Sequence, residues 1–597
     1  MDFSFEKDRQ LASLTTFHID AKARLFASYQ SVEQLKAISF SEEFLENEVC
    51  HLGVGSNLLF KGDFDGLILH SEIKGIKRYD KDADTVFVIA GAGENWSELV
   101  DWTIKQGLSG IENLAGIPGS VGAAPVQNIG AYGCEVGSFI HNVECFDIVT
   151  HNLITLSARE CKFGYRDSIF KNEGKGKYII TRVSFRLRNS TLASNLDYGP
   201  LKSLERKVGH HPSIQEVATE IKNIRDTKLP DPAVYGSAGS YFKNPVVRIF
   251  FYKEVMCSLV PDIPFYPTED PYYVKIPAGW LIEHAGLSGY AVGDAQVYPS
   301  QCLVIINKGN ASADDILAVE RHVVKTVLEK FGVELQREVN VIDSDIKITI
   351  LGSGTSKGIP EIGCYCPVCR SDDPKDKRLR CSALIETQGI KLLIDVSPDF
   401  RTQALNVGLT SLDGALITHN HYDHVGGFDD LRPFCKNGKF NVYLRPDVNA
   451  DLHRRLDYCF KDHLYPGVPS FAMHEIDNSP FLIKGVKIIP VTVMHGNVPI
   501  VGFRIGNFAY ITDAKVIAVE ELEKLKNLEV LVINALRYKD HFAHLTVDEA
   551  LEIISELKPK RAYLTHFCHE VGKHCDLEKK LPENVFPAFD GMTIISH

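Results

Sequence analysis

Cysteine is scarce and repetition is missing in this chain of 597 residues. Its 14 cysteines are far too few for a scaffold held together by disulfides. No repeat of the kind that builds solenoids is visible, nor any low-complexity tract. The opening residues, MDFSFEKDRQ, include acidic side chains and lack the apolar run of a secretory signal. We therefore expect reduced thiols and a cytoplasmic protein.

Charge is absent from residues 113–134, NLAGIPGSVGAAPVQNIGAYGC, a stretch long enough to cross a bilayer. Its glycines, prolines and amide side chains argue against a membrane span, because irregular backbone leaves unsatisfied N–H groups in lipid. The stretch instead predicts buried, glycine-rich loops that meet a ligand. We expect no contact with a membrane.

Basic residues are outnumbered, since 65 Lys and Arg face 77 Asp and Glu, which gives a net charge of −12. An acidic chain without a basic, aromatic-interleaved stretch is a poor nucleic-acid binder, so we expect small-molecule substrates. The hydrophobic fraction of 44% and the charged fraction of 24% are those of ordinary globular proteins. Composition leaves the oligomeric state open.

The clearest boundary lies near residues 343–345, where FGVELQREVNVI gives way to IKITILGSG across a linker too short to be a flexible tether. Before it, hydrophobic periodicity predicts strands at 86–93 and 177–187 and helices at 97–106 and 212–227. After it, a helix is predicted at 546–557, and strands are predicted at 383–396, 414–419, 487–495, 508–514, 528–535 and 561–567. Several of these strands end in His or Asp, so those side chains should converge at one rim of a sheet.

The strongest motif, THNHYDH at residues 418–424, directly follows a predicted strand. Imidazole and carboxylate ligands suit zinc, manganese or iron. His419 and His421 are two residues apart and can point the same way, whereas Asp423 and His424 can turn toward a neighbouring second site. The spacing therefore predicts two adjacent metal sites.

With this motif the chain resembles the metallo-β-lactamase superfamily, which implies an αββα fold over residues 346–597. The resemblance implies His495 as the third ligand of the first metal, Asp513 as a bridging carboxylate and His566 as a ligand of the second metal. It further implies two catalytic divalent metals, zinc or manganese, that activate water for hydrolysis. Asp423 is expected to help orient the attacking water.

A cysteine-rich run, GCYCPVC, contributes Cys364, Cys366 and Cys369, and LTHFCH ends in His569. With these residues the second half resembles the phosphoribosyl cyclic phosphodiesterases within that superfamily. Three thiolates and one imidazole form a closed tetrahedral site, so we expect one structural zinc. Plain buried thiols and redox chemistry are the alternatives, and Cys381 is close enough to be another ligand.

The same resemblance implies His544, in HFAHLTVDEAL, as a general acid near the leaving group, with His541 as the alternative. Fold does not fix the substrate, which we expect to be a phosphodiester or another ester. A regulatory or scaffolding module and an RNA-processing nuclease stay open as alternatives for this half. The complete set of metal ligands argues against a decayed site.

Glycine-rich turns in the first half let backbone amides approach a phosphate, although a tight turn is the better explanation of either glycine pair taken alone. They lack the spacing of a Rossmann fingerprint, so a nicotinamide fold is not expected. The residues that we expect to bind the cofactor are Gly53, Gly55, Ser56, Asn57, Gly91, Gly93, Glu94, Asn95, Gly119, Ser120 and Gly122.

Taken in order, these blocks resemble the UDP-N-acetylenolpyruvoylglucosamine reductases, flavoenzymes of peptidoglycan precursor synthesis. The matching runs are TTFHID, LGVGSNLLF, AGAGENW, GIENLAGIPGSVGAAPVQNIGAYG, KFGYRDSIFK, TKLPDP, GSAGSYFKNPVV and PAGWLIE. The fold implied is an α+β FAD-binding reductase of the vanillyl-alcohol-oxidase type with an inserted substrate domain. It implies a first FAD-binding region (1–75), a second FAD-binding region (76–228, with a return at 326–343) and the substrate-binding domain (229–325).

The reductase resemblance implies FAD and NADPH as cofactors and a UDP-sugar as substrate. Arg166 matches a cation on the substrate carboxylate side, Glu338 its partner near the developing enolate, and Ser240 the proton donor to C2. A serine hydroxyl is a poor acid in water, so it needs a preorganised site. Substrate or nucleotide contacts are expected from Tyr198, Arg225, Lys228, Asn244 and Gln301.

Overall fold

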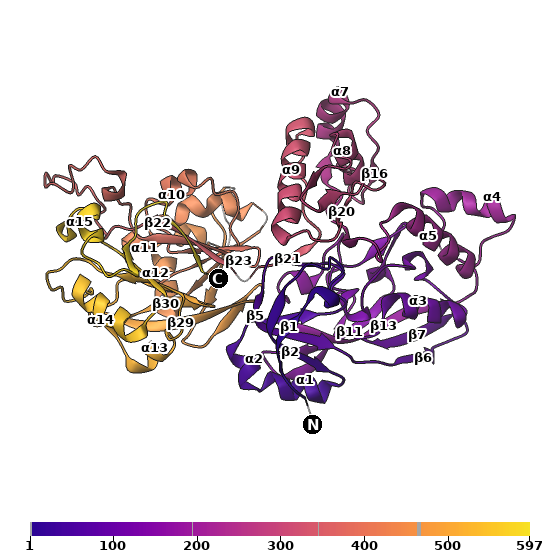
Figure 1. Ribbon diagram of the computed structural model, residues 1–597, viewed down its shortest axis with the longest axis horizontal. Coiled ribbons are helices and arrows are strands. Elements are labelled where there is room, and N and C mark those ends of the chain that lie inside the picture. Colours follow the sequence, from indigo (N-terminus) through magenta and orange to yellow (C-terminus); the bar gives the residue numbers. More distant parts are fainter. Residues whose placement is uncertain (1–2, 194, 344, 437, 462–466, 597) are drawn as a thin grey trace. The chain divides into compact units, whose positions relative to one another are not determined.

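The computed structural model describes residues 3–193, 195–343, 345–436, 438–461 and 467–596 (Figure 1). The chain divides into two compact units, Met1–Asp343 and Ser344–His597, called the first and the second unit below. Among the helices that are described, none combines the length and the apolar character needed to cross a bilayer.

The first unit begins with two sheets. The smaller has the order β1 (Glu6–Gln10), β2 (Lys22–Tyr29), β5 (Phe64–Ser71) and β3 (Val49–Leu52). The larger has the order β12 (Asn152–Ser157), β11 (Ile140–Asp147), β13 (Tyr178–Asn189), β7 (Thr85–Gly91) and β6 (Ile76–Asp80), with β8 (Leu108–Ser109) paired to β13. The helices of this region are α1 (Val32–Ser39), α2 (Glu42–Glu46), α3 (Trp96–Lys105), α4 (Leu204–Val208) and α5 (Ile214–Lys228).

In β7 and β13, buried apolar side chains alternate with more exposed ones, which explains why helices cover one face of the larger sheet. Val86, Val88 and Ala90 are fully buried at every second position of β7, as a half-buried strand requires. They share a core with Leu99 of α3 and Val217 of α5. Both helices start at side-chain caps, which replace the hydrogen-bond partners that a helix start lacks.

A third region of the first unit has its own core. Its sheets are β14 (Gly236–Ser240), β20 (Val304–Asn307), β19 (Ala295–Val297) and β18 (Ala291–Val292), and β15 (Val246–Arg248), β17 (Tyr273–Lys275) and β16 (Tyr266–Pro267). Short helices α6 (Ile249–Phe251) and α7 (Cys257–Leu259) follow β15, and α8 (Ala278–His284) packs beside α9 (Ala313–Phe331) (Figure 1). The chain then returns through β21 (Asn340–Ile342), which pairs with β4 (Leu58–Phe60).

The second unit contains two sheets. One has the order β27 (Phe471–Glu475), β26 (Phe440–Leu444), β25 (Gly414–Leu416), β24 (Ile390–Ile394), β23 (Ser382–Thr387), β22 (Ile346–Gly352) and β36 (Thr593–Ser596). The other has the order β28 (Phe481–Ile483), β29 (Val486–His495), β30 (Val498–Ile505), β31 (Phe508–Ile511), β33 (Val530–Asn534), β34 (Arg561–Thr565) and β35 (Val585–Pro587), with β32 (Val516–Ile517) on β29.

Both sheets of the second unit are buried on both faces. Ile385 and Ile394 pack between the sheets with Ile488 and Phe503, whereas Leu393, next to Ile394, packs outward. The outer cores involve α10 (Phe400–Asn406), α11 (Tyr422–Val425) and α12 (Pro446–Arg455) on one side and α13 (Val519–Glu523), α14 (Val547–Leu557) and α15 (His574–Glu578) on the other. The alternation thus produces the αββα layers that the resemblance implied.

The predicted strands and helices are confirmed with one difference. Residues 383–396 form two strands, β23 and β24, instead of one run. Gln388 and Gly389 both have positive φ, 48° and 78°, which a tight two-residue hairpin turn requires. The apolar residues on either side hid this turn in the sequence.

Phe185 provides a test of the first unit's core. It is fully buried and makes an edge contact with Trp96, with ring centroids 5.9 Å apart. We expect Phe185→Ala to lower the free energy of unfolding of this unit by about 3–5 kcal/mol because it leaves a cavity. Urea unfolding followed by tryptophan fluorescence measures this, with Val149→Ala, at a site 63% exposed, as the control. Equal midpoints for both variants would contradict this view of the core.

Candidate flavin cavity and metal centre

A cavity of about 330 Å³ in the first unit brings together most of the predicted cofactor residues and the three predicted catalytic ones. Its walls include Gly53, Gly55, Ser56, Asn57, Gly119, Ser120, Gly122, Arg166, Arg225, Ser240 and Glu338. These residues come from loops far apart in the chain. The fold therefore assembles one site from several motifs.

Several of the glycines that line this cavity have no room for a side chain, because neighbouring protein atoms lie where a Cβ would be. A Cβ on Gly53 would lie 2.6 Å from Ser120 Oγ, and one on Gly122 would lie 2.7 Å from Ala92 Cβ. Gly55 has a φ of +59°, and a Cβ there would meet the Leu14 carbonyl oxygen at 2.2 Å. Bare backbone along a cavity is what a dinucleotide diphosphate needs, so these residues fit FAD.

The second glycine turn is packed just as closely, but it lies outside the described lining of the cavity. A Cβ on Gly91 or Gly93 would collide with the backbone of residues 71–74, against which this turn packs. Glu94 accepts a hydrogen bond from the Gly75 N–H at 2.6 Å, and Asn95 caps α3. None of these four residues is among those that line the cavity as described. Their role in binding the cofactor stays a prediction.

Arg166 and Glu338 form a largely buried ion pair at the cavity wall, with Nε and Oε1 2.9 Å apart. Arg166 Nη2 also donates to the Gly130 carbonyl at 2.6 Å, so the guanidinium is held from two sides. Burial raises the pKa of Glu338, although Arg166 opposes the shift. Ser240, at the end of β14, lines the same cavity.

The other predicted substrate residues lie outside this lining. Tyr198 is in contact with Tyr132 and Tyr266, with ring centroids 5.7 and 6.5 Å away. Asn244 lines a second cavity of about 560 Å³ and accepts a hydrogen bond from the Ala278 N–H at 2.8 Å. Lys228 ends α5, and Gln301 lies close to Gly279. Their contacts with substrate stay predictions.

In the second unit, the predicted metal ligands converge at one rim of the sandwich. His419, His421, His495 and Asp513 form one group in which the candidate ligand atoms lie within 4.8 Å of one another. His424, Asp513 and His566 form a second group of the same kind. Asp513 belongs to both groups, as a bridging carboxylate would. Asp423 lies beside the second group, with Oδ2 3.2 Å from His424 Nε2.

Left-handed backbone places three carboxyl and imidazole groups at this rim. Asp395, Asp513 and His566 have φ values of 60°, 56° and 61°, and each follows the end of a strand. Such a conformation is costly for residues other than glycine and is typical of functional sites. It turns each side chain off the strand and toward the shared site.

Asp395 is a site residue that sequence reasoning missed. It is fully buried, and its Oδ2 lies 2.6 Å from His424 Nδ1. It also accepts hydrogen bonds from the N–H and hydroxyl of Thr418 at 2.8–3.0 Å. A carboxylate behind a ligand histidine fixes the ring and its tautomer. Asp395 comes just after β24, as Asp513 comes after β31, so its place at the end of a strand could have pointed to it.

The chemistry of these donors fits divalent metals. His419 Nε2 is buried without a hydrogen-bond partner, and His424 Nε2 makes no hydrogen bond although oxygens of Asp423 and Asp513 lie 3.2 and 3.3 Å from it. Asp395, Asp423 and Asp513 bring three buried carboxylates to the same histidine. Buried charge of one sign needs compensation, and metal cations supply it. These residues therefore fit a pair of metal ions.

His544 lies closer to this centre than His541 does. Its Nδ1 is 3.8 Å from Asp513 Oδ2, and its ring is 4.7 Å from that of His495. The ring centroid of His541 lies 4.9 Å from that of His544. Burial lowers the pKa of His544 to about 3, which leaves the ring neutral near pH 7. An acid role would need an anionic substrate beside it to raise that pKa.

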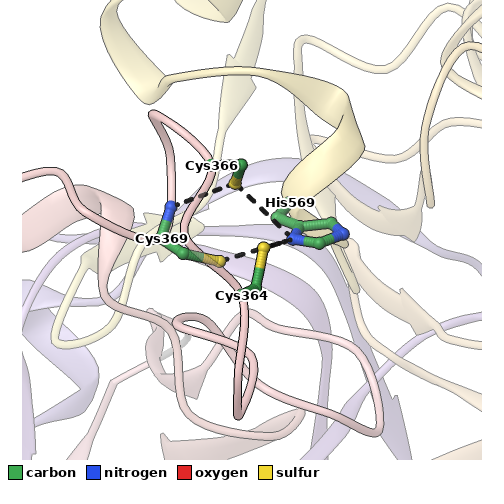
Figure 2. Close-up of side chains that lie close together, drawn as sticks. All are labelled: Cys364, Cys366, Cys369 and His569. Atoms are coloured by element: carbon green, nitrogen blue, oxygen red, sulfur yellow. Dashed lines mark hydrogen bonds between the residues drawn. The ribbon is translucent and has the colours of Figure 1, made fainter.

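The cysteine cluster is assembled as the spacing predicted (Figure 2). His569 Nδ1 lies 3.1, 3.6 and 3.3 Å from the sulfurs of Cys364, Cys366 and Cys369. Although burial opposes it, hydrogen bonds such as that from the Cys369 N–H lower the pKa of Cys366 to about 7. Three sulfurs around one imidazole nitrogen fit a structural zinc.

Cys381 takes no part in this cluster of converging ligand atoms. It is fully buried, and its sulfur lies 3.7 Å from Thr565 Oγ1. Burial raises the pKa of its thiol to about 12, so it stays protonated at neutral pH. A protonated thiol is a poor metal ligand.

Comparison with known proteins gives matches in both units. An FAD binding domain matches residues 24–152, and the C-terminal domain of UDP-N-acetylenolpyruvoylglucosamine reductase matches residues 231–342. The UDP-N-acetylenolpyruvoylglucosamine reductase of Neisseria gonorrhoeae is 43% identical over 343 residues, which are 57% of this chain and 97% of that protein. The chain belongs to this reductase family.

Two further proteins are similar to this chain. The same-named protein of Flavobacterium johnsoniae is 42% identical over 333 residues, 56% of this chain and 98% of its own length. The solved structure of UDP-N-acetylenolpyruvylglucosamine reductase from Thermus caldophilus is 26% identical, covers 57% of this chain and 99% of that one, and has a TM-score of 0.40. The predicted family and the FAD-binding fold class are confirmed.

The second unit matches a beta-lactamase superfamily domain at residues 391–567. A diphosphatase of the PhnP family is 37% identical, covers 42% of this chain and 97% of that one, and has a TM-score of 0.40. The predicted metallo-β-lactamase fold is confirmed. The family members matched by the first unit are themselves covered almost end to end by that unit alone.

We expect Asp395→Asn to weaken metal binding in the second unit by about 10- to 100-fold, because the amide no longer holds His424 as the carboxylate does. Competition with a metal chelator measures the affinity directly. Asp447→Asn, at an exposed ion pair with Arg445, is the matched control. An affinity of Asp395→Asn within twofold of wild type would exclude this role.

Proposed function

We propose that the first unit reduces UDP-N-acetylenolpyruvoylglucosamine to UDP-N-acetylmuramate with NADPH and FAD, in the cytoplasm. The observation that carries this proposal is the convergence of Arg166, Glu338 and Ser240 on the glycine-lined cavity. The FAD-binding regions at 1–75 and 76–228, with the return at 326–343, would surround the cofactor. Residues 229–325 would bind the substrate.

FAD, held along Gly53, Gly55 and Gly122, would supply the hydride chemistry for C3 of the enolpyruvyl group, with NADPH as the source of electrons. The negative charge that develops on the substrate then lies beside Arg166, whose guanidinium is already oriented by Glu338 and the Gly130 carbonyl. Preorganised charge of this kind costs no reorganisation during the reaction. Ser240 donates the proton to C2, which completes the reduction.

The remaining candidate residues would contact the UDP-sugar or NADPH away from the reacting carbons. Tyr198 would close over the UDP-sugar. Its ring contacts with Tyr132 and Tyr266 would hold the side chain in position for this. Lys228 and Asn244 would contact a diphosphate of the UDP-sugar or a phosphate of NADPH. Arg225, at the cavity wall, and Gln301 would contact the nucleotide.

Replacing Ser240 separates the two halves of the reaction. We expect Ser240→Ala to leave the reduction of bound flavin by NADPH unchanged but to slow substrate reduction by about 10²- to 10⁴-fold, because the proton donor is lost. Rapid mixing that follows flavin absorbance measures both steps. Ser237→Ala, on the same strand, is the control. A normal rate of substrate reduction in Ser240→Ala would remove this serine from the mechanism.

We further propose that the second unit is a metal-dependent hydrolase of phosphodiesters or other esters. Its support is the pair of ligand groups that share Asp513, together with the buried His419 Nε2, which makes no hydrogen bond. Two bound zinc or manganese ions would lower the pKa of water and stabilise charge on the reacting group. A third ion, a zinc, would hold Cys364, Cys366, Cys369 and His569 as a structural knot.

Individual residues have distinct tasks in this proposal. Asp423, beside His424, would orient the attacking water, and Asp395 would hold the ring of His424. His544 would transfer a proton to the leaving group, with His541, whose ring lies 4.9 Å away, as the alternative. A regulatory module would need no such ligand set. An RNA-processing nuclease would need a basic surface that the acidic net charge of −12 does not favour.

Leaving-group dependence tests the role of His544. We expect His544→Ala to reduce kcat/KM for 2′,3′-cyclic AMP, which has a poor leaving group, about 100-fold or more. Cleavage of bis-p-nitrophenyl phosphate, which needs little proton donation, should fall far less. His541→Ala is the comparison variant. Equal losses on both substrates would show that His544 is not the acid.

A further inference from the structure

The segment 536–546 of the second unit connects β33 to α14 and carries both His541 and His544. Its two ends are joined, since the Leu536 N–H donates to the Leu545 carbonyl at 2.9 Å and the Val547 N–H donates to the Arg537 carbonyl at 3.0 Å. The segment is therefore a closed loop and not an extended connection.

This loop contacts the strands that carry the metal ligands. The Leu545 N–H donates to the carbonyl of Ala514, the residue after Asp513, at 2.8 Å. His495 Nδ1 lies 3.0 Å from the Ala543 carbonyl. Both contacts lie at the C-terminal end of the loop, close to His544. These two contacts do not reach the tip of the loop, around Asp540.

Lys515 binds the tip of the loop through its side chain. Its Nζ lies 2.8 Å from Asp540 Oδ1 and 2.8 and 3.0 Å from the two carboxylate oxygens of Glu549. An ammonium group has three N–H donors, and these contacts can use all of them. The Lys515 side chain is only 18% exposed, although Asp540 is 83% exposed.

The backbone of Lys515 is fixed to the metal centre at the same time. Its N–H donates to the carbonyl of Met494, the residue before His495, at 2.7 Å. Glu549 in turn accepts a hydrogen bond from the Thr546 N–H at 2.8 Å and so completes the cap of α14. Lys515 thus links the metal-ligand strand, the loop tip and the start of the next helix.

We propose that Lys515 is a positioning residue of the hydrolytic site: it clamps segment 536–546 so that His541 and His544 keep their places beside Asp513. This inference rests on the proposed hydrolase function. Without the ammonium, the carboxylates of Asp540 and Glu549 would face each other unneutralised and repel. The loop tip would then move away and take the two imidazoles with it.

Three variants test the clamp in the metal-loaded full-length protein. Lys515→Met removes the charge, Lys515→Arg keeps it, and Asp540→Asn weakens one arm at an exposed site. For 2′,3′-cyclic AMP, we expect Lys515→Met to lower kcat about 10- to 100-fold with KM changed less than threefold, whereas kcat for bis-p-nitrophenyl phosphate should fall far less because that substrate needs little proton donation. Lys515→Arg should recover most of the rate, and Asp540→Asn should show a smaller loss of the same kind.

Amide hydrogen exchange separates positioning from general damage. We expect Lys515→Met to lose protection across 536–546 while residues 418–424 and the bound metal content stay as in wild type. Unchanged exchange and kcat in Lys515→Met would overturn the proposal, as would a loss that Lys515→Arg does not recover. Should Lys515→Met fail to fold, Asp540→Asn decides the matter by the same two measurements.

The two proposals can fail separately. If the metal-loaded wild type cleaves neither substrate, the hydrolase function falls, yet the exchange measurement still shows whether Lys515 holds the loop. If wild type is active and Lys515→Met keeps both its rate and its loop protection, only the clamp is refuted.

Discussion

Buried charge is the constraint on which both candidate sites depend. Asp513 is 2% exposed and lies between the imidazoles of two ligand groups, and Asp395 is fully buried behind His424. Carboxylates in such a place are stable only if imidazoles, hydroxyls and cations surround them. The αββα layers supply that environment, because apolar residues on both faces of each sheet exclude water from everything except the rim where the strands end.

The first unit solves the same problem without a metal cluster among its described residues. Glu338 is compensated by Arg166, and the guanidinium is held in turn by the Gly130 carbonyl. This pair lies at the wall of a cavity that several glycines, among them Gly53, Gly55 and Gly122, also line. A fixed guanidinium charge beside an open cavity suits a reaction in which negative charge forms on a bound substrate. Fixed carboxylates beside buried imidazoles, as in the second unit, suit cations.

Backbone conformation links sequence to site in both units. Arg166, Asp395, Asp513 and His566 all adopt positive φ, which only a strongly determined surrounding can impose on such residues. In the second unit the surrounding is a strand end packed on both faces, so the strain is supported by the core. Segment 536–546 has no such support at its tip, and there an ion pair takes the place of packing.

The sequence by itself determined the fold class, the family and most ligand identities, because long motifs such as THNHYDH and the alternating strands leave few arrangements open. It could not separate glycines that line a cavity, such as Gly53, from those that pack against backbone, such as Gly91, because both read as glycine pairs after a strand. It also could not reveal the contacts of Asp395 or Lys515, or show that His544 lies nearer to Asp513 than His541 does. Only the tertiary structure decided these, because each depends on which loops meet in space, and loop contacts between distant segments leave no periodic signal in the chain.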